Sequence, residues 1–133
     1  MNFIELPSPN FDQRRAPISM IVLHYTGMES AQAALDRLAD PAAKVSAHYV
    51  VAEDGQIVRM VDEANRAWHA GRSEWRGIMD VNSASIGIEI VNPGHEFGYR
   101  PFPEPQMAAV EALVSDIAHR SRISTCMVVG HSD

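Results

Sequence analysis

The chain has 133 residues, of which 46% are hydrophobic and 21% are charged, so it is long enough to build one domain around a substantial core. Its net charge of −6 argues against a nucleic-acid-binding protein, which favours a basic face. No apolar run reaches the length of a membrane span, and the N-terminus, MNFIELPSPNFDQRR, lacks the apolar stretch of an export signal. With its single cysteine, the chain is expected in the cytoplasm, or in the periplasm or at the outer membrane if a signal was removed.

The first part of the chain predicts an irregular start, a buried strand and a helix. Three prolines interrupt residues 1–18, which argues against regular structure there. Residues 20–25, MIVLHY, are typical of a strand covered on both faces, and alternation places His24 on the same face as two apolar side chains. Ser30 can cap a helix that ends at Asp40 and the following proline.

The rest of the chain predicts a hairpin, three further strands and a long helix. Residues 45–61 hold two apolar runs around an EDG turn, which is typical of a β-hairpin. Residues 67–71, AWHAG, suggest a short strand, and residues 85–91, SIGIEIV, a strong one. Residues 104–122 carry an apolar stripe at helical spacing, and residues 125–129 form a last strand. This order predicts an α/β fold with a mixed central β-sheet flanked by helices.

The histidines are the first candidates for chemistry, although none lies in a tight local metal motif such as HExxH. His24 and His131 each stand at the far end of an apolar strand, so parallel neighbouring strands would bring both rings to one edge of the sheet. A catalytic zinc site uses three protein ligands, so a third would be needed. Taken alone, His24 also fits a strand-end histidine bonded to a backbone carbonyl. His119 fits an exposed helix end.

Glu89 is the second candidate, because a carboxylate within an isoleucine-rich strand is costly to bury unless it is paired, bound to a metal or facing a cleft. Gly87 lies on the same face and leaves room for a substrate. In such a cleft, Glu89 could act as a general base on a bound water. A structural salt bridge to a buried arginine is an equally good interpretation.

Two further features allow weaker predictions. Arg72, Trp75 and Arg76, just after AWHAG, could grip a sugar or an anionic peptide, but tryptophans more often pin a loop. Cys126 has no activating feature nearby, which predicts a buried, unreactive thiol.

Five stretches in fixed order, VLHYT, VSAHYVV, RAWHAG, SIGIEIVN and GHSD, closely resemble the zinc-dependent N-acetylmuramoyl-L-alanine amidases. The subgroup is the one named after the bacterial enzymes AmpD and AmiD, and it shares its fold with phage T7 lysozyme and the peptidoglycan recognition proteins. The resemblance runs from about residue 17 to the end. It implies a bacterial zinc hydrolase, acting as a monomer in cell-wall catabolism, that cleaves the amide between N-acetylmuramic acid and L-alanine in peptidoglycan or muropeptides.

The resemblance also implies roles for individual residues. His24 and His131 match the two histidine zinc ligands of the family, and Glu89 matches the acid that activates the zinc-bound water. His69 lies in a loop that borders the cleft, and Lys44 stands where some relatives carry a basic residue that contacts the substrate.

One departure from the family pattern concerns the third zinc ligand, an aspartate or cysteine that follows the second histidine in the family. The chain ends at Asp133, so the third ligand is expected beyond that residue, and residues 1–133 are expected to be a single amidase domain truncated at its C-terminus. The alternative is a non-catalytic recognition module that binds peptidoglycan without cutting it. A zinc amidase acting on an unrelated amide is a third reading.

Overall fold

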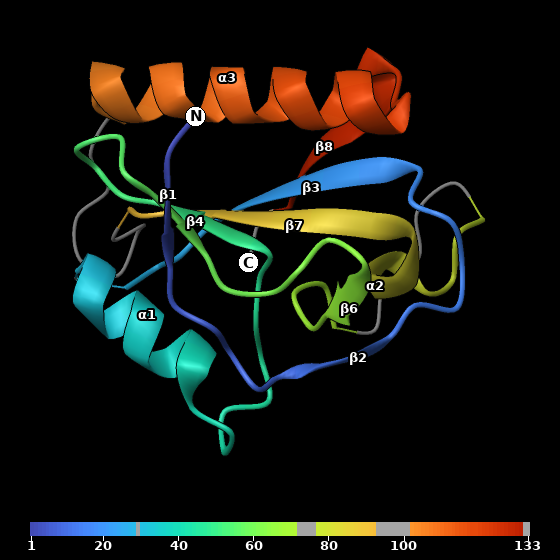
Figure 1. The fold of residues 1–133 in the computed structure, drawn as a ribbon, viewed down its shortest axis with the longest axis horizontal. Helices are drawn as coiled ribbons and strands as arrows, with labels where there is room; N and C mark the ends of the chain where they lie inside the picture. Colours follow the sequence, from blue (N-terminus) through green and yellow to red (C-terminus); the bar gives the residue numbers. More distant parts are fainter. Residues whose placement is uncertain (29, 72–76, 93–101, 132–133) are drawn as a thin grey trace.

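The computed structural model describes residues 1–28, 30–71, 77–92 and 102–131, with His131 described by its backbone alone. Figure 1 shows the elements in chain order, which are β1 (Phe3–Glu5), β2 (Phe11–Gln13), β3 (Met20–Tyr25), α1 (Ala31–Ala39), β4 (Tyr49–Val51), β5 (Ile57–Arg59), β6 (Asn65–Ala67), α2 (Val81–Ala84), β7 (Ser85–Ile90), α3 (Glu104–Ser121), a 3-10 turn (Thr125–Met127) and β8 (Val128–His131).

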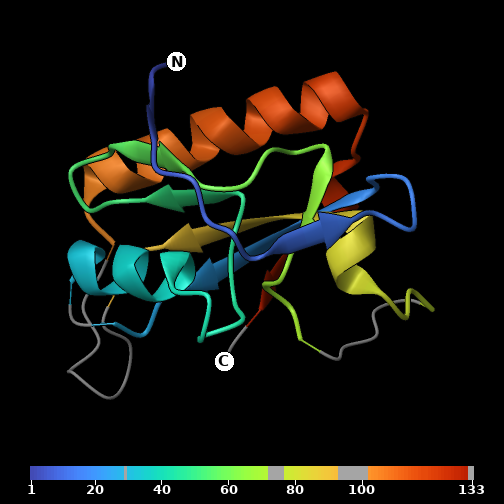
Figure 2. The same ribbon diagram turned by 60° about the horizontal axis from the view of Figure 1, so that its bottom comes forward.

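A mixed sheet of six strands, in the order β1-β5-β4-β7-β3-β8, forms the middle layer of the molecule. The β4–β5 hairpin is antiparallel, as predicted, and the other neighbours in this sheet are parallel. Strands β2 and β6 form a separate antiparallel pair. Helix α3 covers one face of the large sheet, and α1 and α2 lie on the other side (Figure 2). The predicted α/β fold with a mixed central sheet between helices is confirmed.

Strict alternation along the central strands divides the core into two sides. Ile21 on β3 and the isoleucines of β7 pack against α3, together with Leu113 and Ile117 of that helix. Met20 and Val22 point to the opposite face and pack against Val81 of α2. Each such side chain contributes about 1.5–3 kcal/mol when fully buried. His24 continues the second face, as predicted from the sequence.

Helix α1 begins and ends where the sequence predicts. The Ser30 hydroxyl accepts a hydrogen bond of 3.1 Å from the backbone N–H of Ala33, and the helix ends at Ala39. None of the described helices is both long and apolar enough to cross a membrane.

The ends of the chain differ from the prediction. Residues 1–18 are not all irregular, because β1 pairs with β5 and β2 pairs with β6, both through partners distant in sequence. The short strand expected at 67–71 lies at Asn65–Ala67, and the last strand begins only at Val128. The residues before it form a 3-10 turn in which Cys126 is exposed, so the prediction of a buried thiol is wrong.

Gln106, on the first turn of α3, ties that helix to the ends of two central strands. Its side chain is fully buried, and its amide Nε2 donates to the carbonyls of Val51, at 3.0 Å, and Val91, at 2.9 Å. The Val51 carbonyl also accepts from the Val91 N–H. Gln106 therefore donates hydrogen bonds to backbone carbonyls at the C-terminal ends of β4 and β7.

Replacing Gln106 with leucine keeps the volume but removes the donor, so we expect the free energy of unfolding to fall by about 1–3 kcal/mol. Urea unfolding followed by circular dichroism measures the change. The matched control is Gln32→Leu on the exposed side of α1, where the shift should stay within about 0.5 kcal/mol. Equal effects of the two substitutions would contradict the assigned role of Gln106.

Candidate active site

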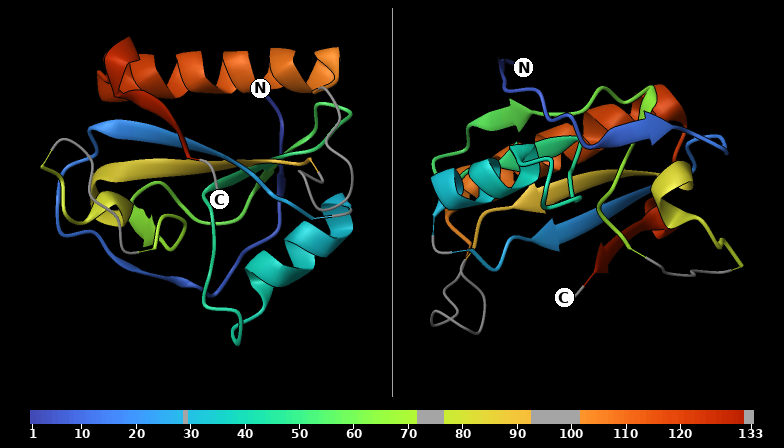
Figure 3. Two further views of the ribbon diagram at one scale, coloured as in Figure 1. Left: turned by 180° about the vertical axis from the view of Figure 1, so that it is seen from behind. Right: turned by 90° about the horizontal axis from the view of Figure 1, so that it is seen from below.

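Three adjacent parallel strands bring the principal candidate residues to one level of the sheet. His24 on β3 is paired with Glu89 on β7 and, on its other side, with His131 on β8. Neighbouring strands lie about 4.8 Å apart, so the three backbone positions form a short row across the sheet. Figure 3 shows β8 at the edge of the sheet, beside β3. The predicted meeting of His24 and His131 at one sheet edge is confirmed at the level of the backbone, with His24 in the middle of the row.

His24 is fixed inside the protein by a second histidine. Its side chain is 1% exposed, and its Nε2 lies 3.0 Å from Nδ1 of His69. The other ring nitrogen of His69 lies 3.0 Å from the hydroxyl of Ser85, which in turn donates to the Val81 carbonyl at 2.6 Å. A chain of hydrogen bonds therefore runs from His24 through His69 and Ser85 to the backbone of α2.

Gly87 makes room for this arrangement. A Cβ atom on Gly87 would lie 2.5 Å from Cδ2 and 2.7 Å from Nδ1 of His69, which is too close for any side chain. The sequence predicts that Gly87 leaves space for a substrate. That prediction is wrong, because the ring of His69 occupies the space.

Asn82 positions the loop that carries His69. Its buried Oδ1 accepts from the backbone N–H groups of His69, at 3.0 Å, and Ala70, at 2.8 Å. Arg14, from the N-terminal segment, donates to the carbonyls of Ser83, at 2.8 Å, and Ser85, at 2.9 Å. Sequence analysis missed all these supporting residues, because their partners are backbone groups that only the fold brings near.

His48 is a second buried histidine on the same face of the sheet. Its Nδ1 accepts from the Gly87 N–H at 3.0 Å, and its Nε2 lies 2.9 Å from the Asn65 carbonyl. Burial lowers the pKa of His48 from 6.5 to about 4, even though the Asn65 carbonyl favours the charged ring. His48 is therefore a neutral structural residue at neutral pH.

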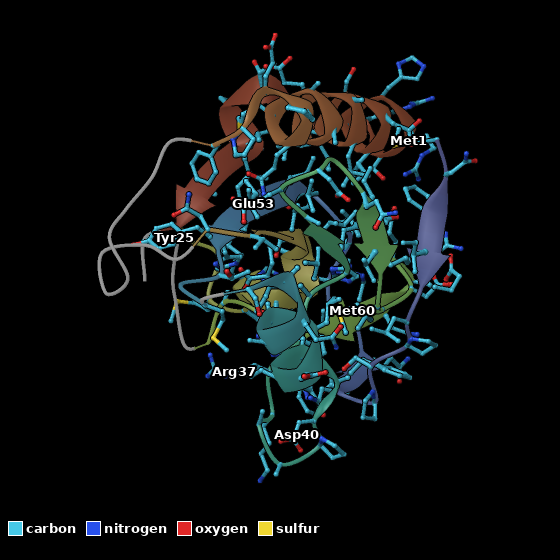
Figure 4. The ribbon with its side chains drawn as sticks, turned by 90° about the vertical axis from the view of Figure 1, so that its left-hand side faces the viewer. Met1, Tyr25, Arg37, Asp40, Glu53 and Met60 are labelled. Carbon is cyan, nitrogen blue, oxygen red and sulfur yellow. The ribbon has the colours of Figure 1, made fainter. Side chains whose placement is uncertain are left out.

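Glu89 borders a small pocket between the sheet and α1. The pocket has a volume of about 20 Å³, room for about one water molecule, and its lining includes Thr26, Arg37 and Glu89. The Oε2 atom of Glu89 is buried. Figure 4 labels Tyr25, at the end of β3, and Arg37, on α1, both in the left half of the view, and Arg37 is one of the residues that line this pocket. Glu89 thus combines a sheltered carboxylate oxygen with space for a small polar molecule.

The remaining predicted site residues have different outcomes. Lys44 is exposed and adopts a left-handed backbone conformation, with φ of 53°, shortly before β4, and its contact with substrate stays a prediction. The same holds for a substrate contact by His69. Arg72, Trp75 and Arg76 lie outside the described residues. Within the described side chains, which leave out that of His131, no group of three or more His, Cys, Asp or Glu residues could hold a metal ion.

This fold and this row of residues define the class of protein. The family model for N-acetylmuramoyl-L-alanine amidase matches residues 14–133. The chain therefore belongs to the N-acetylmuramoyl-L-alanine amidase family.

Individual relatives agree with that family. The chain is 36% identical to the N-acetylmuramoyl-L-alanine amidase AmiD of Escherichia coli, over 87% of this chain and 45% of AmiD. It is 30% identical to the 1,6-anhydro-N-acetylmuramyl-L-alanine amidase AmpD of Haemophilus influenzae, over 97% of this chain and 79% of AmpD. The structure of Escherichia coli AmiD in complex with anhydro-N-acetylmuramic acid-L-Ala-D-gamma-Glu-L-Lys superposes with a TM-score of 0.79 at 35% identity, covering 90% of this chain and 51% of that one. The chain thus spans about half the length of AmiD and most of the length of AmpD.

The burial of neutral His48 predicts a pH dependence of stability. A histidine whose pKa is lowered by folding stabilises the native state above its unfolded pKa of about 6.5, and this contribution is lost as the pH falls toward 4. Across that window we expect His48 to account for a loss of up to about 3 kcal/mol. Unfolding free energies at several pH values should therefore fall less steeply for His48→Gln than for wild type.

The control for this prediction is His119→Gln, at the exposed end of α3, which should keep the wild-type slope. An NMR titration of the wild-type His48 ring gives the same answer where the variant is too unstable to study. A ring that becomes protonated near pH 6.5 would overturn the assignment.

Proposed function

We propose that the protein is a zinc-dependent amidase that hydrolyses the bond between N-acetylmuramic acid and L-alanine in peptidoglycan or muropeptides. The observation that carries the proposal is the row of Glu89, His24 and His131 on three adjacent parallel strands. Membership of the amidase family supports it, as does the muropeptide substrate bound to the related AmiD of Escherichia coli. The cytoplasm stays the predicted location.

The residues at this level fit a zinc ion in their donor chemistry. Imidazole nitrogens are ligands that zinc prefers, and His24 and His131 would hold the ion together with a third protein ligand. The hydrogen bond to His69 fixes the ring of His24 in one orientation before any ion arrives. A bound zinc ion supplies Lewis acidity, which polarises a carbonyl and makes water a stronger acid.

Glu89 supplies the proton transfer in this proposal. A water beside its carboxylate attacks the lactyl carbonyl carbon, and Glu89 takes one proton from that water. The C–N bond then breaks, and the same proton passes to the nitrogen of the leaving L-alanine. The one-water pocket beside Glu89 and its buried Oε2 suit this role, because a sheltered carboxylate interacts strongly with a nearby proton.

A recognition module that holds muropeptide without cutting it is the second candidate. Binding alone has no need for a carboxylate in the central sheet, level with His24, where its desolvation is costly. We therefore favour hydrolysis, with Lys44 as a proposed substrate contact. Both ring nitrogens of His69 are engaged within the protein, so His69 would meet the substrate only through the carbon atoms of its ring. Cleavage of a purified muropeptide separates the two functions, since a recognition module releases no L-alanine amine.

Replacing Glu89 with glutamine keeps the shape of the side chain but removes the base. We expect amide hydrolysis to fall by a factor of about 10²–10⁴, with zinc content unchanged, because Glu89 moves a proton and does not hold the ion. Chromatography of a digested muropeptide measures the activity, and atomic absorption of the purified protein measures the zinc.

The matched control is Glu111→Gln, an exposed glutamate on α3, which should retain wild-type activity. Full activity in Glu89→Gln would refute the assigned role of Glu89. A wild-type protein that carries the complete zinc ligand set, binds muropeptide and leaves it intact would favour the recognition module.

A further inference from the structure

We infer that His69 is a positioning residue that fixes the tautomer of His24, so that Nδ1 of His24 is the nitrogen presented to the metal. The inference rests on the proposed zinc site and deepens it. It follows from the directions of the hydrogen bonds that link Val81, Ser85, His69 and His24.

The direction of the first bond is set by a backbone carbonyl. The hydroxyl oxygen of Ser85 lies 2.6 Å from the carbonyl oxygen of Val81. A carbonyl can only accept, so the single hydroxyl proton of Ser85 lies in this bond. Toward His69, Ser85 therefore has only lone pairs to offer, and it must accept.

The direction of this bond determines which ring nitrogen carries the proton, first in His69 and then in His24. Because Ser85 accepts at 3.0 Å from Nε2 of His69, that nitrogen carries the proton of the neutral ring. Nδ1 of His69 is then a lone-pair acceptor, and it lies 3.0 Å from Nε2 of His24. His24 must donate from Nε2. Its own neutral ring consequently has its lone pair on Nδ1, the form in which a histidine nitrogen binds a metal.

This arrangement corresponds to a general property of metal sites. A histidine ligand donates its second ring N–H to a neighbouring acceptor, which fixes the ring orientation and tautomer. That acceptor is commonly a carboxylate or a backbone carbonyl, whereas here it is a neutral imidazole. The acceptor is itself held in place, because Asn82 anchors its backbone and Gly87 admits its ring. The two ring nitrogens of His69 are thus already engaged inside the protein.

The ring tautomers can be measured without any metal. Long-range ¹⁵N–¹H correlation spectra of the metal-free protein, labelled on histidine, assign the proton on each ring at a pH well above the ordinary histidine pKa of about 6.5. We expect both His24 and His69 to carry the proton on Nε2. In Ser85→Ala, which removes only the hydroxyl acceptor, we expect His69 to lose this single tautomer. A wild-type His24 with its proton on Nδ1 would overturn the inference.

The consequence for the metal is tested by zinc affinity. His69→Phe keeps a ring but no nitrogen, and we expect zinc to bind about 10–100-fold more weakly in competition with a chelator. His119→Phe, at the exposed end of α3, should bind as wild type. Unchanged affinity in His69→Phe would also overturn the inference.

These two readouts separate the inference from the proposed function. If the wild-type protein binds no zinc, the proposed function fails, and the tautomers of His24 and His69 still decide the inference by NMR. If zinc binds and muropeptide is cleaved while His24 is protonated on Nδ1, the function stands and the inference fails.

Discussion

The parallel pairing of β7, β3 and β8 is the constraint on which the site depends. In this register, His24 lies opposite Glu89 on one side and His131 on the other. A shift of one residue in either strand would send a side chain to the other face of the sheet, where α3 covers the core. The isoleucines of β7, packed against α3, stabilise that register. The apolar side of the sheet therefore determines which polar residues meet on the opposite side.

Beside the apolar side chains of Met20, Val22 and Val81, that opposite side carries buried polar residues that are held by hydrogen bonds. His48 is buried as a neutral ring bonded to the backbone, and Asn82 and Arg14 satisfy groups of the loops around β7. Burying such groups without partners would be costly, so each bond also fixes a position. These hydrogen bonds support the region around His24 in the absence of any ligand. Rigid support of this kind is what a metal or catalytic site needs.

Much of this organisation could be predicted from the sequence, for identifiable physical reasons. The apolar runs that end in His24 and His131 predict strands from local sequence alone. The alternation around Glu89 likewise predicts which face of the sheet its side chain occupies. The supporting residues could not be found in the same way. Ser85 and Asn82 act through backbone groups that only the fold brings close, and Gly87 accommodates a ring from a distant loop. Strands β1 and β2 escaped prediction because distant partners, rather than their own three-residue sequences, stabilise them.

The proposed function requires one metal ion where β3 and β8 meet. Crystals of the zinc-loaded protein, measured on both sides of the zinc absorption edge, locate the ion by its anomalous scattering without reference to activity. We expect a single strong peak within bonding distance of His24 and His131, about 2.0–2.1 Å from a nitrogen of each ring. A peak elsewhere on the chain, or ligation that leaves out His24, would contradict the assignment.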